Sequence, residues 1–157
     1  MTQGHAKITS EVSGKDVAKV LQPVLVDLVG LALNGKQLHW HVRGRYFLPV
    51  HERLDAVIDD AREFADTVAE RLVALDVLAD GRPATVATTT NLPEVAPGFT
   101  SDDKVVGAVV DQLDATIARA RAAMEALETT DTVSQDIVIE ALRALEKHRW
   151  MFAAQLG

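Results

Sequence analysis

The sequence has no cysteine, few aromatic residues and no long uninterrupted apolar run. Without cysteine the chain cannot form disulfides, thiolate zinc sites or iron–sulfur clusters, so any bound metal must be held by His, Asp and Glu. The longest apolar stretch, residues 24–33, is interrupted by Asp27 and Gly30, and we therefore expect no membrane-spanning helix. Because the first residues lack the basic start and apolar run of a signal peptide, we expect a cytoplasmic protein.

The length and composition predict one globular domain. With 157 residues, 48% hydrophobic and 25% charged, the chain can bury a single core, and we assign residues 1–157 to one domain with residues 1–15 as a flexible N-terminal arm. The formal net charge is −7, which predicts a surface that repels nucleic acid. Lysines near the N-terminus are interspersed with acids, so they do not form a strongly basic arm.

Apolar residues recur every three or four positions and predict four long helices. The first covers residues 16 to about 42, with Pro23 either as a kink or as the start of its regular part. The others run from Pro49 to before residue 80, from Ser101 to 127, and from Thr132, whose capping box includes Gln135, to the end. Residues 81–100 form a long connection with one short helix near 84–90, and no strand is expected. The sequence therefore predicts an all-α, ferritin-type four-helix bundle with a long crossover between helices two and three.

Acidic residues and one histidine share a face of the predicted second helix. At about 100° and 1.5 Å per residue, Asp55 and Asp66 differ by about 20° in direction but lie about 16 Å apart along the axis. One ion cannot bridge that distance, so the helix carries two half-sites, His51 with Asp55 and Asp66 with Glu70.

Two antiparallel copies of this helix, related by a two-fold axis near Asp60, would bring unlike half-sites together and form two metal sites at a dimer interface. The small residues Val57, Ala61, Ala65 and Ala69 could allow such close packing beside the acids. No Glu-x-x-His motif occurs, which argues against a ferritin centre within one subunit, and no His-Glu-x-x-His motif indicates a zinc protease. An ordinary solvated helix face is the alternative.

Three elements of the segment KQLHWHVRGRYFLPVHERLDAVIDDAREFADTVAERL resemble the Dps proteins, mini-ferritins named as DNA-binding proteins from starved cells. These elements are KQ-x-HW, VHE-x-LD and D-x-x-AER, in the order and spacing of the family. The ending TVSQDIVIEALRALEKHRWMF also resembles the last helix of that family.

The resemblance implies a ferroxidase centre shared between two subunits. His39, His51 and Asp55 would be iron ligands from one subunit, and Asp66 and Glu70 would come from its two-fold partner. Trp40 corresponds to the family's tryptophan near the centre, which is thought to intercept oxidising equivalents, although a packed interface aromatic is the ordinary reason for such a residue.

Other polar residues are assigned with alternatives. Asp131, Asp136 and Glu140 correspond to the region that lines the family's three-fold pores, through which iron enters, and acids near a helix start are otherwise common. His41 stands where the family more often has Asn, and the alternatives are an extra metal ligand or a residue directed elsewhere, since two positions along a helix point it away from His39. We expect His5 and His148 to be ordinary surface or packing residues.

The resemblance implies a homododecameric shell that oxidises ferrous iron with hydrogen peroxide in preference to dioxygen and stores the ferric product. The N-terminal arm carries few unopposed lysines, which predicts little or no DNA binding. The family name leaves association with the nucleoid as the alternative to a purely cytoplasmic location. The alternatives are a DNA-compacting protein with a vestigial metal site and, from a third class, a metal-dependent hydrolase.

Overall fold

The computed structural model describes residues 13–157, and residues 1–12, including His5, lie outside the described part. The helices are α1 Gly14–His41, α2 Phe47–Ala74, α3 Pro83–Thr89, α4 Asp102–Leu127 and α5 Thr132–Ala153, and the strands are β1 Val42–Arg43 and β2 Thr100–Ser101. Helix α1 begins inside the expected arm, because the side chain of Ser13 caps it by accepting from the Asp16 amide. The arm of residues 1–15 therefore contains two helical residues at its end.

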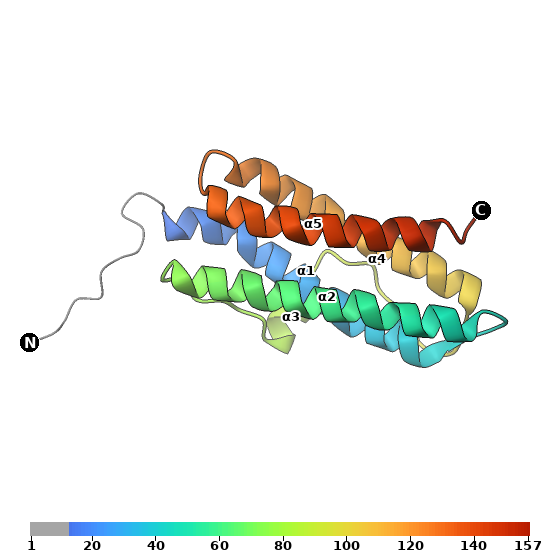
Figure 1. Ribbon diagram of the computed structural model, residues 1–157. Helices are drawn as coiled ribbons and strands as arrows, with labels where there is room; N and C mark the ends of the chain where they lie inside the picture. Colours follow the sequence, from blue (N-terminus) through green and yellow to red (C-terminus); the bar gives the residue numbers. More distant parts are fainter. Residues whose placement is uncertain (1–12) are drawn as a thin grey trace, which may run out of the picture.

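Four long helices form an antiparallel bundle (Figure 1). Helix α1 packs against α2, helix α4 packs against α5, and the chain between α2 and α4 travels from one end of the bundle to the other. Large apolar side chains from all four helices are fully buried between them, among them Leu21, Leu28, Leu54, Leu72, Leu113, Leu145 and Phe152. The predicted ferritin-type bundle with its long crossover and short helix is confirmed. None of the helices within residues 13–157 is long and apolar enough to cross a membrane.

The helix boundaries differ from the prediction in small ways with physical reasons. Helix α1 runs without interruption through Pro23. Helix α2 begins two residues before Pro49, which the first turn tolerates because the N–H groups there have no partner within the helix. Helix α5 is capped by Asp131, whose carboxylate accepts from the Ser134 amide, and not by the predicted Thr132.

A pair of two-residue strands was not predicted. Strand β1 follows α1 directly and pairs in parallel with β2, which precedes α4. Gly44 has φ 139°, and a Cβ atom there would lie 2.5 Å from the Asp102 carboxylate. That carboxylate accepts from the Tyr46 amide at 2.6 Å, so it links the α1–α2 turn to the start of α4.

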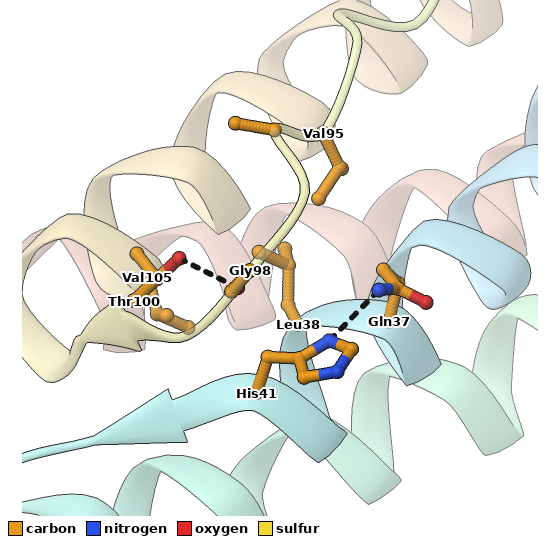
Figure 2. Close-up of a pocket in the computed structure, with 8 residues that line it drawn as sticks. Gln37, Leu38, His41, Val95, Gly98, Thr100 and Val105 are labelled. Carbon is orange, nitrogen blue, oxygen red and sulfur yellow. Dashed lines mark hydrogen bonds between the residues drawn. The ribbon is translucent and has the colours of Figure 1, made fainter.

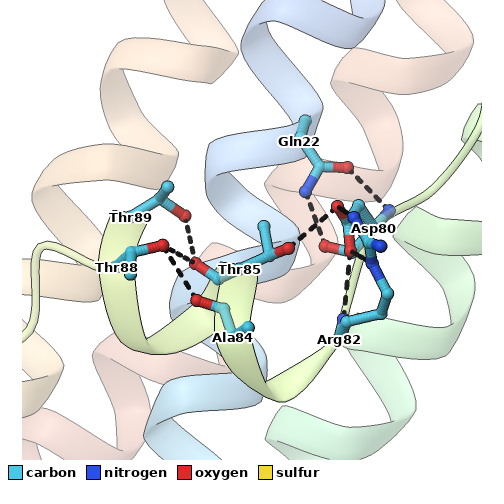
Figure 3. Close-up of polar contacts among 7 residues, drawn as sticks. All are labelled: Gln22, Asp80, Arg82, Ala84, Thr85, Thr88 and Thr89. Atoms are coloured by element: carbon cyan, nitrogen blue, oxygen red, sulfur yellow. Dashed lines mark hydrogen bonds and ion pairs between the residues drawn. The ribbon is translucent and has the colours of Figure 1, made fainter.

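The crossover is held to the bundle by buried polar groups. Asp27 is fully buried on α1, and its carboxylate accepts from the Thr90 hydroxyl, the Asn91 amide and the Arg119 guanidinium at 2.7–2.9 Å. Nearer the end of α2, the side chain of Gln22 makes two hydrogen bonds with the Asp80 backbone (Figure 3). These contacts connect α1, α4 and the crossover. They also explain why Asp27 interrupts the apolar stretch of residues 24–33.

The small residues of α2 do not form an outer face. Val57, Ala61 and Ala65 are buried in the subunit's own core, and Ala69 packs against that core. The suggestion that these residues allow close packing with a second subunit is therefore wrong. The close approach occurs instead between α1 and α2 within the subunit, where a Cβ atom at Gly35 would lie 2.9 Å from Ile58.

Candidate functional site

Two histidines meet where α1 ends and α2 begins. The Nδ1 atom of His39 lies 2.9 Å from the carbonyl oxygen of His51, and the Nδ1 atom of His51 lies 2.8 Å from the carbonyl oxygen of His39. Because a carbonyl only accepts, each Nδ1 carries the proton and each Nε2 keeps its lone pair. The two rings stack with centroids 3.6 Å apart. The pair therefore presents two side-by-side imidazoles in the tautomer that binds a metal through Nε2.

Asp55 completes this group with a carboxylate. Its Oδ1 atom lies 3.4 Å from Nδ1 of His39 and 2.6 Å from Nζ of Lys36. The Lys36 ammonium holds the pKa of Asp55 below its usual range, so the carboxylate is charged at neutral pH. A cation bound at Asp55 must therefore compete with Lys36.

Lys36 was not among the predicted site residues. It lies three residues before His39, on the same helical face, and this spacing could have indicated it.

Asp66 and Glu70 lie on exposed positions of α2, further along the helix than Asp55. Among residues 13–157, no three His, Asp or Glu side chains come together in an arrangement that could hold a metal ion. His39 and His51 therefore pack together with Asp55 near His39, but the three do not by themselves form a metal-binding arrangement, and Asp66 and Glu70 lie further along α2.

Trp40 follows His39 but points away from the core, with 63% of its surface exposed. Leu33 lies two turns earlier on the same side of α1 and is 59% exposed. Exposed apolar side chains on one helical face are typical of a surface that another protein chain covers.

His41 belongs to a different part of the molecule. Its Nδ1 atom is 2.8 Å from Nε2 of Gln37, and its ring packs edge-on against Phe99 of the crossover. Figure 2 shows His41 and Gln37 beside the crossover segment that contains Gly98 and Thr100. His41 therefore contacts the crossover and not the pair formed by His39 and His51.

The three predicted pore residues differ in their surroundings. Asp131 is buried, caps α5 and accepts from Arg71 at 2.7 Å. Burial alone would raise the pKa of Asp131, but the hydrogen bonds from Ser134 and Arg71 outweigh this effect and lower it. Asp136 and Glu140 are exposed on α5. Asp131 thus has a structural role within the subunit, which leaves Asp136 and Glu140 as the exposed acids of this group.

His148 is neither a surface residue nor an apolar packing residue. It is 3% exposed, its Nδ1 accepts from the Arg53 guanidinium at 2.9 Å, and its Nε2–H donates to Asp60 at 2.6 Å. The sequence did not indicate this group, because its members come from helices α2 and α5 and are far apart along the chain.

Comparison with known proteins identifies the family. Residues 18–157 match the ferritin-like domain family. Relatives include the DNA protection during starvation protein of Mycolicibacterium smegmatis, 32% identical over 94% of this chain and 80% of the relative. DNA protection during starvation protein 2 of Deinococcus radiodurans is 31% identical over 90% of this chain, which spans only 59% of that relative's length.

Solved structures agree with this assignment. The structure of Dps from Microbacterium arborescens in a high iron form superposes with a TM-score of 0.90 and 39% identity, covering 97% of this chain and 99% of that one. The structure of DpsA14 from Streptomyces coelicolor gives a TM-score of 0.88 at 29% identity and covers 97% of this chain. The fold, the sequence motifs and these similarities show that the chain belongs to the Dps family of ferritin-like proteins.

Proposed function

We propose that this protein is a ferroxidase and iron-storage protein whose metal centres lie between subunits of a hollow homododecamer. The observation that carries the proposal is the pair His39 and His51, whose Nδ1 protons are both committed to carbonyl oxygens next to the Asp55 carboxylate. Imidazole nitrogen with carboxylate oxygen is a ligand set that suits iron, and the carboxylates favour its ferric state.

The second half-site comes from the partner subunit in this proposal. His39, His51 and Asp55 lie near one another in one subunit, while Asp66 and Glu70 are exposed about three and four turns beyond Asp55 on α2. A two-fold axis crossing α2 at the level of Asp60 would exchange the two half-sites between antiparallel copies of the helix. Asp60 itself faces α5, where it accepts from His148, so the contact surface is the α2 face that carries Asp55 and Asp66.

Iron is the substrate and cargo of this reaction. Two ferrous ions give up one electron each, and the two electrons cleave the O–O bond of hydrogen peroxide to give two hydroxides. Hydrolysis of the ferric ions then releases protons and produces the mineral that is stored. The chain's own residues bind the ions, and the fixed Nδ1–H bonds keep both Nε2 lone pairs available throughout. Asp136, exposed on α5, is our proposed pore residue.

The test adds ferrous iron without oxygen and then hydrogen peroxide, and records ferric absorbance and iron bound per subunit. We expect His51→Ala and Asp66→Asn each to lose fast oxidation. As a matched control, Asp111→Asn removes an exposed carboxylate from α4 and should oxidise iron like the wild type.

Mixing the two inactive variants after dissociation distinguishes a shared centre from one within a subunit. In a mixed dimer, one site carries both substitutions and the other carries neither. Random pairing should therefore restore about one quarter of the wild-type sites. No recovery in mixtures that have reassembled would exclude the shared centre, and equal peroxide and dioxygen rates would exclude the peroxide preference.

Protection of DNA by direct binding is the second candidate, because relatives are named for DNA protection during starvation. The net charge of −7 works against contact with phosphates. We therefore propose that protection results from removing ferrous iron and peroxide together. A salt-sensitive gel shift of DNA by the iron-free protein at near-neutral pH would favour the direct role.

A further inference from the structure

An open groove of about 460 Å³ lies between α2 and α5, away from the face of α2 that carries Asp55 and Asp66. Its charged lining consists of Arg53, Asp60, Glu140, Arg143, Lys147 and His148. These residues take no part in the proposed ferroxidase centre, and the groove therefore needs its own explanation.

The cations of the groove lack carboxylate partners. Within residues 13–157, five arginines form ion pairs, whereas Arg53, Arg143 and Lys147 of the groove form none, as is also true of Arg43, Arg45 and Arg62 elsewhere. Arg143 and Lys147 lie one turn apart on α5, so both project to the same side of that helix. The lining also holds two acids, Asp60, which accepts from the neutral His148, and Glu140, so the three cations leave the groove with one net positive charge.

Arg53 also has an unused donor. Its Nε atom is buried and has no hydrogen-bond partner in the described part of the chain, whereas its NH2 group donates to His148. A buried guanidinium N–H without an acceptor is costly, and because protein atoms cover this Nε, contact with an anion in the groove falls to the terminal nitrogens of Arg53. Because His148 accepts from Arg53 and donates to Asp60, its neutral ring holds the guanidinium at the wall of the groove.

We propose that this groove binds a polyvalent oxyanion of the phosphate class through Arg53, Arg143 and Lys147. The planar guanidinium groups suit the bidentate geometry of such an anion, and the ammonium adds a point charge. Arg143 and Lys147 are exposed on α5 and are therefore accessible to an anion in the groove. The site is independent of the ferroxidase centre and requires no bound iron.

The test uses the iron-free full-length protein and inorganic phosphate at constant ionic strength, with binding followed by calorimetry and by ³¹P line broadening. We expect saturable binding that weakens about tenfold or more in the double variant Arg143→Gln and Lys147→Gln. Arg53→Lys keeps the charge but loses the planar fork, and we expect it to weaken binding severalfold. Arg121→Gln, on α4 and outside the groove, is the matched control and should bind like the wild type.

The Glu140→Gln variant distinguishes an anion site from a cation site by the direction of the change in affinity. Removing that carboxylate should strengthen phosphate binding, whereas a cation site would be weakened by the same change. Binding that is not saturable, or equal loss in Arg121→Gln, would overturn the proposal, as would displacement of phosphate by equimolar chloride. Thermal melting of each variant separates loss of binding from loss of folding. Since no iron is present, failure here is distinct from failure of the ferroxidase proposal.

Discussion

At the scale of single residues, protonation and pairing decide what each polar side chain can do. His39 and His51 hold each other in one tautomer, whereas His148 is held neutral between Arg53 and Asp60. In these three histidines, the hydrogen bonds alone decide which ring nitrogen carries the proton. Lys36 also affects this site, because its ammonium pairs with the Asp55 carboxylate that a metal ion would use.

Lys36→Gln is expected to tighten binding of ferrous iron. The change removes the ammonium 2.6 Å from Asp55 and leaves that carboxylate free for a cation. Since the pair is partly exposed, we expect a gain of about two- to fivefold in affinity. Anaerobic calorimetry with ferrous iron measures it, and Lys104→Gln on α4 serves as the exposed control. Weaker binding would mean that Lys36 supports the site instead of competing with it.

His148→Gln is expected to change the dependence of stability on pH. Burial lowers the pKa of His148 below that of an unfolded histidine, although Asp60 opposes this. Below about pH 6.5 the unfolded chain takes up a proton that the folded chain does not, so the wild type loses stability as pH falls toward the folded pKa.

The His148→Gln variant should lack this loss and should be less stable by about 1–3 kcal/mol at pH 7, where the partly exposed Arg53 and Asp60 lose their hydrogen bonds to the buried ring. Urea unfolding at several pH values measures both effects. An identical pH slope in the two proteins would show that His148 is not the titrating group.

At the scale of elements, polar residues position the long connection that the apolar pattern leaves undefined. Buried Asp27 joins α1 to the crossover and to α4, and Gln112 on α4 donates to the Pro93 carbonyl. Helix α3 packs on α1 rather than projecting from the bundle. The crossover is therefore attached along its path by hydrogen bonds, which have no periodic signature in a sequence.

Asp27→Asn should destabilise the fold by about 3 kcal/mol, because the partly buried Arg119 loses its counter-charge while its desolvation remains. Urea unfolding measures the change in the free energy of unfolding. Asp16→Asn removes an exposed ion pair of α1 and should have little measurable effect. Similar losses in both variants would contradict a special role for the buried pair.

At the scale of the whole molecule, the subunit has an apolar surface on α1 that residues 13–157 do not cover. Trp40 and Leu33 are exposed on one side of α1, and Trp40 directly follows His39 of the histidine pair. Pairing of subunits on this face would cover the apolar residues and complete the ligand set in one step.

Trp40→Glu is therefore expected to prevent pairing and to abolish fast iron oxidation, since a charge would be buried at the interface. Trp40→Phe keeps an apolar ring there and should preserve the assembly. Sedimentation velocity gives the oligomeric state of each variant. A fully assembled Trp40→Glu protein that has lost oxidation would indicate a chemical role for the indole and not a packing role.

Local sequence determined the helices and which side chains share a face of each, because a helix repeats every 3.6 residues. The proposed pairing of His51 with Asp55 and of Asp66 with Glu70 rests on that spacing, and the length of the crossover is read from the gap between the helical patterns. Only tertiary structure decided contacts between distant segments. Burial gave Asp131 a capping role, placed Ala61 in the core, and joined Arg53, Asp60 and His148 into one group. Such outcomes depend on which helix faces meet, and that is settled by packing the whole chain at once.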